Sequence, residues 1–324
     1  MKLTMKAWFL AVASLMAVAT AAFAEDYPAR TVKLLVGYAP GGAPDTAARI
    51  IGQRLSQILK QSFIIENRPG AGGTLAAAQT AKAVPDGYTL SVADVGEMVI
   101  SPYIYKELPY DTSKDFTPVG LAVLAPVVIV SNAKTTNIKT LADLVRQAKA
   151  SPGTLNYGSS GIGSIHHLSM EMFKTEAGID VTHVPYKGAG QSVPALLGGQ
   201  VPLLMSGFTA ISSHAKSGQV NLLAVTSAKR FPGAPDVPTV SEFYKGFDYA
   251  SEIGLLAPAG LSPEIVAKLS AALKIVLDEP ETKEKLIKVG MIPNWLSPQD
   301  YAETIRQNLK KYKRAVEVAH AGPS

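Results

Sequence analysis

Turns rich in glycine carry the residues of this chain that are best suited to chemistry. The first turn covers residues 36–46 and reads Val-Gly-Tyr-Ala-Pro-Gly-Gly-Ala-Pro-Asp-Thr, an apolar strand end followed by a helix start. Paired glycines let the backbone approach a ligand closely, and Pro44 suits the first turn of a helix. Free N–H groups and the positive end of the helix dipole favour a carboxylate, phosphate or sulfate. The turn is therefore a candidate anion site, and the alternative is an ordinary turn in which Asp45 only caps the helix.

Two later turns repeat this pattern. Residues 66–73 read Glu-Asn-Arg-Pro-Gly-Ala-Gly-Gly, and residues 159–164 read Ser-Ser-Gly-Ile-Gly-Ser before another helix. A hydrogen bond to a charged group contributes about 1.5–3 kcal/mol, whereas micromolar affinity needs about 8 kcal/mol. If two such turns face each other, a handful of backbone and hydroxyl donors can hold a small carboxylate without a lysine or arginine.

Residue patterns typical of enzymes and metal sites are missing. The chain has no cysteine, and it contains no G-x-S-x-G elbow, Walker loop or complete G-x-G-x-x-G. His166 and His167 form the one histidine pair, and neighbours on a helix point about 100° apart, so they are poorly placed to hold one metal ion. We therefore predict no catalytic residues, no metal and no cofactor. A secreted hydrolase that uses a hydroxyl beside a histidine stays as a minor alternative.

The N-terminus predicts export. Lys2 and Lys6 precede an apolar run over residues 7–18, and Ala-Phe-Ala at 22–24 is a small-residue cleavage site. No later stretch reaches the roughly 18 apolar residues of a membrane span. Without Lys2 and Lys6 the 31 basic residues fall to 29 against 26 acidic ones, and they are scattered. Nucleic-acid binding is not expected, because it requires basic runs or a basic helical face.

The elements that must position the turns follow an α/β order. Strands, helices and glycine turns alternate from residue 32 to 92, which is typical of a doubly wound sheet with ligands at the carboxyl ends of its strands. We expect a loop over 93–98, a surface connection over 102–118, and a strand over 126–130 that crosses into a second domain. Residues 251–257 predict a crossing strand back, and three capped helix starts follow it.

Several motifs resemble one known family. The matching segments occur in order from about residue 27 to the C-terminus. They are Tyr38–Gly42 with Asp45, residues 66–73, Pro85–Leu90, Tyr157–Ser159, Gly163-Ser164 with His167-Leu168, Val184–Gly188, Leu197–Gln200 and Asp236–Thr239. The chain resembles the Bug family, the periplasmic solute-binding proteins of tripartite tricarboxylate transporters.

The resemblance implies an α/β, type II-like periplasmic binding protein, with two doubly wound sheets joined by crossing strands and a ligand cleft between them. Residues 1–24 would be the signal peptide, 25–126 and 251–324 domain 1, and 127–250 domain 2. It also implies a monomer in the periplasm that captures a small carboxylate, aromatic or dicarboxylic, and delivers it to the membrane permease subunits. A ligand-loaded co-receptor for a sensor kinase is the alternative function.

The resemblance also implies which residues bind the ligand. Gly41, Gly42, Ser159, Gly163 and Ser164 are expected to donate hydrogen bonds. Tyr38 would form a wall, and Asp45 would orient the loop or a water molecule. His167 belongs to the matched motif at the turn over residues 159–164.

This chain departs from the family pattern at two places. Many members read Gly-Thr-x-Gly-Thr-His where residues 93–98 read Ala-Asp-Val-Gly-Glu-Met, which brings Asp94 and Glu97 near the expected cleft. Members that bind amino-bearing ligands carry an aspartate where this chain has Ser206, which argues against an α-amino acid. We include Asp94, Ser206 and Phe208 in the expected site. Phe208 and Met98 would form an apolar wall, or alternatively belong to the core.

Overall fold

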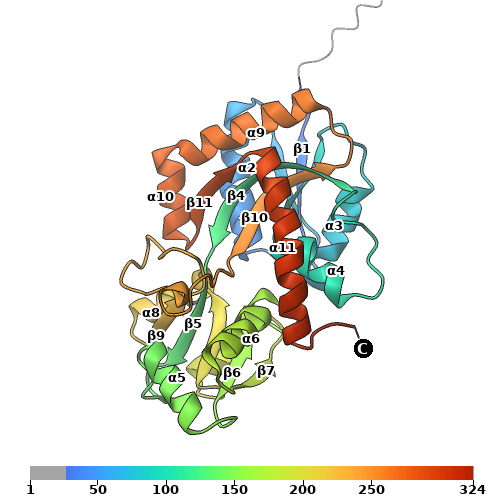
Figure 1. Cartoon of the computed structure of the whole chain (residues 1–324). Helices are drawn as coiled ribbons and strands as arrows, with labels where there is room; N and C mark the ends of the chain where they lie inside the picture. Colours follow the sequence, from blue (N-terminus) through green and yellow to red (C-terminus); the bar gives the residue numbers. More distant parts are fainter. Residues whose placement is uncertain (1–26, 324) are drawn as a thin grey trace, which may run out of the picture.

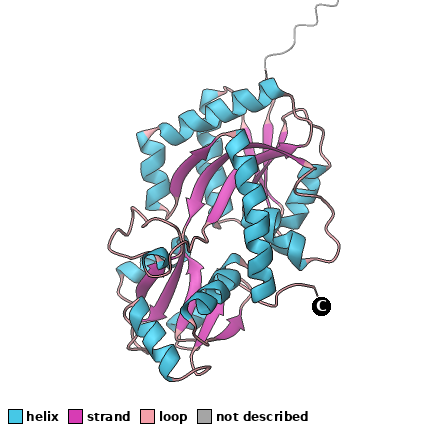
Figure 2. Ribbon diagram, in the orientation of Figure 1, coloured by secondary structure: helices cyan, strands magenta, loops and turns pink. Residues whose placement is uncertain are grey.

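The computed structural model describes residues 27–323, and the predicted signal peptide lies outside them. The described chain forms two lobes, each built on one β-sheet (Figure 1). Lobe 1 contains the six-stranded sheet in the order β11-β4-β10-β3-β1-β2, and lobe 2 contains the five-stranded sheet in the order β7-β6-β8-β5-β9. Helices cover the faces of both sheets (Figure 2). The predicted α/β class is confirmed.

The sheet of lobe 1 is mixed. Its parallel part places β1 between β2 and β3, and β10, β4 and β11 extend it in antiparallel fashion. The strands are β1 (Val32–Val36), β2 (Phe63–Asn67), β3 (Thr89–Ala93), β4 (Phe116–Ala125), β10 (Ser251–Pro258) and β11 (Ile292–Leu296). The sequence did not predict β11, because a five-residue strand that contains a proline carries no alternating pattern.

The helices of lobe 1 bury an apolar stripe against this sheet. They are α2 (Ala43–Ile58), η1 (Ala71–Gly73), α3 (Thr74–Ala81), η2 (Gly96–Ile100), α4 (Ser101–Ile104), α9 (Pro263–Asp278), α10 (Pro280–Lys288) and α11 (Pro298–Val318). Ile51 and Leu55 of α2 are fully buried in one cluster with Leu34 of β1 and Leu269 of α9. This burial of residues at helical spacing is the main reason why α2 is held at the carboxyl end of β1.

The loop expected over 93–98 is partly helical. Residues 96–100 form the π-helical turn η2 and lead directly into α4. Met98 is 2 % exposed and its backbone oxygen accepts a hydrogen bond from Thr112, so it is a core residue rather than part of a ligand wall. The apolar run of Met98, Val99 and Ile100 explains the error: it packs into the core, which a surface loop does not do.

Lobe 2 repeats the arrangement with fewer strands. Its strands are β5 (Val127–Asn132), β6 (Asn156–Ser159), β7 (Thr182–Pro185), β8 (Leu203–Gly207) and β9 (Val220–Val225), and β6 is parallel to both β7 and β8. Its helices are α5 (Leu141–Ala150), α6 (Ile165–Ala177), α7 (Ala189–Leu197), α8 (Phe208–Lys216) and η3 (Val240–Glu242). The side chain of Thr140 caps α5 in the predicted capping box with Asp143.

Two chain crossings join the lobes. The first is a pair of strands, β4 in lobe 1 and β5 in lobe 2, separated by Pro126, where the sequence predicted one strand over 126–130. Proline has no N–H for a ladder, and its carbonyl accepts instead from Phe208 N at 3.0 Å. At the second crossing the hydroxyl of Thr226 donates to Tyr249 O at 2.7 Å and contacts Val127 O at 3.1 Å. The two crossings are thus tied to each other beside β5.

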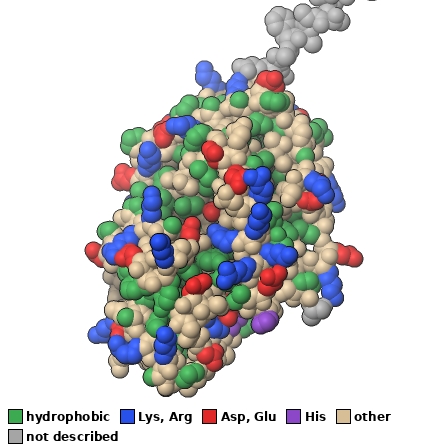
Figure 3. All heavy atoms as spheres, in the orientation of Figure 1, with side chains coloured by type: hydrophobic (Ala, Val, Ile, Leu, Met, Phe, Trp, Pro, Cys, Tyr) green, Lys and Arg blue, Asp and Glu red, His purple; other side chains and the backbone are tan. Residues whose placement is uncertain are grey.

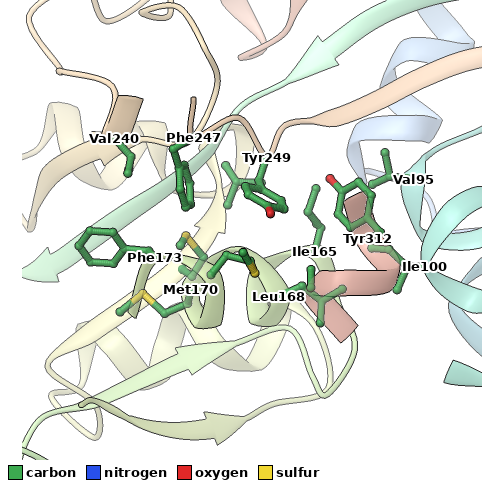
Figure 4. Packing of buried hydrophobic residues seen from close by; sticks show 14 of the residues in the cluster. Val95, Ile100, Ile165, Leu168, Met170, Phe173, Val240, Phe247, Tyr249 and Tyr312 are labelled. Atoms are coloured by element: carbon green, nitrogen blue, oxygen red, sulfur yellow. The ribbon is translucent and has the colours of Figure 1, made fainter. Parts of the chain in front are cut away.

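One side of the lobe boundary is packed with apolar residues. Tyr312 of α11 contacts Tyr249 edge to face at a centroid distance of 5.7 Å, and both lie in a cluster with Leu168 and Met170 of α6 (Figure 4). Ile100 and Val95 extend this cluster into lobe 1 (Figure 4). The C-terminal half of α11 therefore connects the lobes through side-chain packing.

The surface and the helices agree with the sequence on charge and hydropathy. Over the described residues, no helix is long and apolar enough to cross a bilayer. On the face drawn in Figure 3, basic and acidic side chains are interspersed, with basic ones more frequent over α11. The sequence of the 21-residue α11 contains five basic residues, Arg306, Lys310, Lys311, Lys313 and Arg314.

Candidate functional site

The carboxyl ends of the parallel strands in the two lobes face each other across the boundary. In lobe 1 these ends lead into the turns after β1, β2 and β3, and in lobe 2 into the turns after β6, β7 and β8. Two contacts join lobe 1 to the turns of lobe 2. Gly163, in the turn after β6, lies against Ile104 of α4, and Phe208, which follows β8, lies against Gly290 of lobe 1. A ligand at this boundary would be reached from both lobes.

The buried carboxylate of Asp45 stabilises the first turn, residues 36–46, through hydrogen bonds. It is 2 % exposed, and its carboxylate accepts from Gly41 N at 2.9 Å, from Asn67 Nδ2 at 2.8 Å and from the guanidinium of Arg49 at 2.9 and 3.0 Å. Burial acts to raise the pKa of Asp45, but the bonds from Arg49, Gly41 and Asn67 lower it below its usual value. Asp45 therefore shapes the loop as an anion. Its oxygens are engaged by these three residues.

The first turn leaves donors at the start of α2. Gly42 is the N-cap, and no side chain caps this helix. Within residues 27–323, the N–H groups of Ala43 and Asp45 have no acceptor, and the N–H of Gly42 has only a long 3.5 Å contact with Ala39 O. Gly41 N–H, by contrast, is bound to Asp45. The donors of the first turn are thus those of residues 42, 43 and 45 rather than of Gly41.

The turn at residues 159–164, which follows β6 and is called the second turn below, is stabilised by its own serine hydroxyls. Ser159 is fully buried, and its hydroxyl accepts from Gly161 N at 3.0 Å and pairs with His183 Nε2 at 2.7 Å. Ser164 is the N-cap of α6: it accepts from His167 N at 3.2 Å and donates to Gly161 O at 2.7 Å. In the described chain the N–H groups of Ile165 and His166 have no acceptor. These two N–H groups are the free donors at the start of α6.

His167 supports this turn from inside lobe 2. It is 5 % exposed, and its Nδ1 accepts from Gly163 N at 3.2 Å. Its ring stacks on His183 at a centroid distance of 4.0 Å, and His183 stacks in turn on Tyr157. Burial lowers the pKa of His167, and burial together with His167 lowers the pKa of His183 to about 4, so both rings are neutral at pH 7. Gly163 and His167 therefore serve the shape of the turn.

His166 is the residue that sequence reasoning missed. It is partly exposed, and its Nε2 lies 3.8 Å from the position that a Cβ on Gly207 would occupy, next to the end of β8. Its Nδ1 is buried and has no hydrogen-bond partner among the described residues. Burial lowers its pKa to about 4, against the charge of Asp94 in the other lobe, which acts to raise it. The one signal in the sequence is its place two residues after the capping serine of α6.

Tyr38 joins the two acidic residues that the sequence singled out. Its hydroxyl lies 2.8 Å from Asp94 Oδ1 and 2.7 Å from Glu97 Oε2. Asp94 also accepts from Gly96 N at 2.6 Å and from the hydroxyl of Ser251 at 3.1 Å. Glu97 is 1 % exposed, and burial, with the charge of Asp94, raises its pKa well above its usual range. Burial therefore favours the protonated form of Glu97, and Tyr38 is an anchored hydrogen-bonding residue.

The side chains of Ser206 and Phe208 are more buried than expected for residues that line a ligand site. Ser206 is 1 % exposed, and its hydroxyl has no partner within residues 27–323. Phe208 is 7 % exposed and packs on Phe231 at a centroid distance of 4.6 Å. Because the ring of Phe208 is surrounded by apolar neighbours, the structure places it in the core of lobe 2 beside lobe 1.

The predicted residues thus divide into two groups. The boundary exposes part of Tyr38, Gly42, Asp94 and Ser164, and His166 joins them. The others lie beneath this layer: Asp45, Ser159, Gly163, His167, Ser206 and Phe208 are buried. Gly41 is exposed, with its N–H turned to Asp45. The exposed group offers free N–H donors from two helix starts and one anionic side chain, with neutral histidines.

A surface hollow lies away from this boundary. It is lined by residues of α5 and the C-terminal half of α6, with Lys149, Glu171 and Lys174 among them. Lys174 is paired there with Glu171 at 2.7 Å. The hollow lies at the end of α6 away from the second turn, so it is separate from the site described above.

Comparisons with known proteins agree with this arrangement. Residues 47–320 match the family model described as "Tripartite tricarboxylate transporter family receptor". The chain is similar to a UPF0065 protein from the gbd 5′ region of Cupriavidus necator, with 37 % identity over 301 residues, which are 91 % of this chain and 89 % of that protein.

Two solved structures carry a carboxylate in their titles. One is "R. palustris Rpa4515 with adipate", with a TM-score of 0.84 and 35 % identity, covering 92 % of this chain and 100 % of that one. The other is MatC from Rhodopseudomonas palustris with bound malate, with a TM-score of 0.76 and 32 % identity, covering 90 % and 100 %. A third similar structure is the periplasmic binding protein BugD, with a TM-score of 0.79. The fold is thus that of a two-lobed periplasmic binding protein, and the family is one of solute-binding receptors rather than enzymes. By its match and its relatives, this chain belongs to the receptor family of tripartite tricarboxylate transporters.

Proposed function

We propose that this protein is a periplasmic solute-binding receptor that captures a small carboxylate between its lobes. In this proposal residues 1–24 direct export, and the monomeric receptor delivers its ligand to the permease subunits of a tripartite transporter. The observation that supports it most is the pair of N–H donor sets without acceptors at the starts of α2 and α6, placed at facing strand ends. Relatives of the same fold whose titles name adipate and malate support the carboxylate class.

The free N–H donors alone can supply the free energy of micromolar binding. Four N–H groups, those of Ala43, Asp45, Ile165 and His166, have no acceptor in the described chain. Each bond to a carboxylate contributes about 1.5–3 kcal/mol, and the helix dipoles add to the field, so the four approach the roughly 8 kcal/mol of micromolar binding. The neutral histidines add no positive charge, so the carboxylate is bound by oriented dipoles.

The two crossings allow the lobes to move as units. We propose residues 25–126 with 251–324 as one domain and 127–250 as the other, because the strands of each sheet fall within these ranges. Pro126 and the segment before Ser251 would then be the places where backbone angles change on closure. Closure would bring the start of α6 onto a ligand that already touches the first turn.

A ligand panel tests the function. Purified protein without residues 1–24 is expected to bind at least one small carboxylate with micromolar or tighter affinity in isothermal titration calorimetry, and to gain several degrees in melting temperature at saturation. The panel contains dicarboxylates, hydroxy acids, amino acids and aromatic carboxylates, with the matching amides as controls. Absence of binding across the whole panel would contradict the proposed function.

Substitution of Gly42 tests the first turn. Gly42 has φ −71°, which any residue adopts, and a Cβ there would meet nothing closer than Ala39 O at 3.6 Å. We therefore expect Gly42→Val to fold normally and to lose affinity about tenfold or more, because its branched side chain would lie over the free donors of α2. Gly190→Val, at an open position in α7 of lobe 2, is the matched control. Unchanged affinity in Gly42→Val would remove the first turn from the site.

A further inference from the structure

Asp94 is the anionic side chain at the exposed part of the site. It follows β3 directly and is partly exposed, whereas its neighbour Glu97 is buried. Three donors fix the Asp94 carboxylate in place: Gly96 N, the hydroxyl of Tyr38 and the hydroxyl of Ser251 at the start of β10. Asp94 therefore presents a carboxyl group in a fixed position at the lobe boundary.

Tyr38 links Asp94 to the buried Glu97. The hydroxyl of Tyr38 is the donor, with Glu97 Oε2 at 2.7 Å and Asp94 Oδ1 at 2.8 Å as acceptors. Gly73 packs so closely on Glu97 that a Cβ would lie 2.9 Å from its carboxyl carbon. Glu97 is thus fixed by packing, and Asp94 is the member of this acidic pair that is partly exposed at the boundary.

A polar group of lobe 2 without a partner lies on the opposite side. His166 has a buried Nδ1 with no hydrogen-bond partner in the described chain, and the charge of Asp94 acts on its ring. Gly207 at the end of β8 lies beside the ring of His166, whereas the unpaired hydroxyl of Ser206 lies on the other face of the strand. Buried polar groups of native proteins are normally paired, so the unpaired Nδ1 of His166, within the electrostatic reach of Asp94, points to a polar ligand group between these two residues.

We propose that Asp94 makes this receptor select a monocarboxylate that also carries a hydrogen-bond donor, an ammonium or a hydroxyl, over a dicarboxylate. This rests on the proposed function and narrows its ligand class. The ligand carboxylate meets the N–H groups at the helix starts, and its donor group meets Asp94. A second carboxylate at that place would face a fixed like charge, whereas an ammonium would gain an ion pair.

The test compares ligands of equal carbon skeleton by calorimetry. For chains of four, five and six carbons the probes are the dicarboxylate, the ω-amino acid and the ω-hydroxy acid, and succinate is also compared with 2-aminobutyrate and 2-hydroxybutyrate. We expect the tightest donor-bearing probe to bind at least about tenfold more tightly than the dicarboxylate of its set. An ammonium that binds better than the hydroxyl identifies an ion pair, and equal affinities identify a neutral hydrogen bond; both agree with the proposal.

Asp94→Asn is the decisive variant. Its amide oxygen keeps an acceptor for Tyr38 and Gly96, and its amide nitrogen can donate to the hydroxyl of Ser251, while the charge is removed. We therefore expect a loss of at least about tenfold for the amino probe and a gain for the dicarboxylate. Asp236→Asn, on an exposed loop of lobe 2, makes the same change in net charge far from the site and should alter neither. If Asp94→Asn does not fold, as judged by circular dichroism and its melting curve, Asp94→Thr takes its place.

Two outcomes would overturn the inference. Tightest binding of a dicarboxylate by the wild-type protein is one, and an unchanged ratio between probes in the Asp94 variant is the other. Neither outcome would contradict the proposed function, because the protein would still bind carboxylates. Absence of binding by every probe would instead remove the proposed function, and this inference with it.

Discussion

Replacement of Gly163 by alanine is expected to abolish ligand binding and to destabilise the fold. Gly163 has φ +75°, in the left-handed region that costs an L-residue about 1–2 kcal/mol, and a Cβ there would overlap Cδ1 of Ile104 in lobe 1. Its N–H also holds His167 in place at 3.2 Å. The alanine would displace the second turn or wedge the lobes apart, and either change moves the free donors of α6. We expect at least about a hundredfold loss of affinity, about 3 kcal/mol or more.

Two further substitutions separate the contact from the backbone strain. Gly178→Ala, at the C-cap of α6, carries the same strain at φ +59° but has open space around its Cβ. It should lose stability like Gly163→Ala in urea denaturation and keep its affinity. Ile104→Ala combined with Gly163→Ala removes the overlapping methyl group and should restore part of the binding.

The combined variant decides whether the lobes meet at this point. If it binds no better than Gly163→Ala alone, the contact between Gly163 and Ile104 does not control the site, and backbone strain in the turn explains the loss. If Gly163→Ala itself binds like the wild-type protein, the second turn is not part of the site.

The local parts of this site were readable in the sequence. The turn after β1, the N-cap role of Ser164 and the capping box at Thr140 each depend on residues within a few positions of one another. Glycine, serine and proline at fixed offsets from an apolar strand specify such structures directly. The prediction that the two lobes face each other came from the resemblance to a family, because no local sequence pattern contains this information.

The remaining parts depend on neighbours that are distant in sequence. Asp45 is held by Asn67 as well as by its own helix, and the ring of His167 is stacked on His183, which lies in β7. His166 lies at the boundary in place of the predicted His167, because successive residues on a helix point about 100° apart. Because packing under α6 sets the absolute orientation of that helix, no sequence pattern could distinguish the two rings.

Replacement of Glu252 by glutamine is expected to stabilise the protein at pH 8 but not at pH 5. Glu252 lies at the start of β10, where its carboxyl accepts from Asn308 Nδ2 at 2.6 Å, with Lys311 and Asp248 nearby. Burial raises the pKa of Glu252 to about 7, in spite of the opposing effect of Lys311. Its value in the unfolded chain is near the ordinary 4.5. Between these two pH values the folded state therefore binds a proton that the unfolded state releases.

The sign of the effect follows from this difference. The contribution of Glu252 to stability is fully present below pH 4.5 and is lost as the pH rises through 7, because ionisation then occurs in a buried place. Glutamine resembles the neutral acid and keeps a carbonyl acceptor for Asn308, so Glu252→Gln removes this loss. At about 1.4 kcal/mol per pKa unit, the variant should gain about 2 kcal/mol over the wild-type protein between pH 5 and pH 8.

Urea denaturation of both proteins at pH 5, 6, 7 and 8 measures this gain. Glu279→Gln is a useful contrast, because the guanidinium of Arg54 bonds to Glu279 and lowers its pKa, so that the same substitution should reduce stability at pH 8. A constant difference between Glu252→Gln and wild type across this range would show that Glu252 stays ionised in the folded protein. Since Glu252 joins β10 to α11 beside the second crossing, its proton would also be the simplest link between pH and the packing that holds the two lobes together.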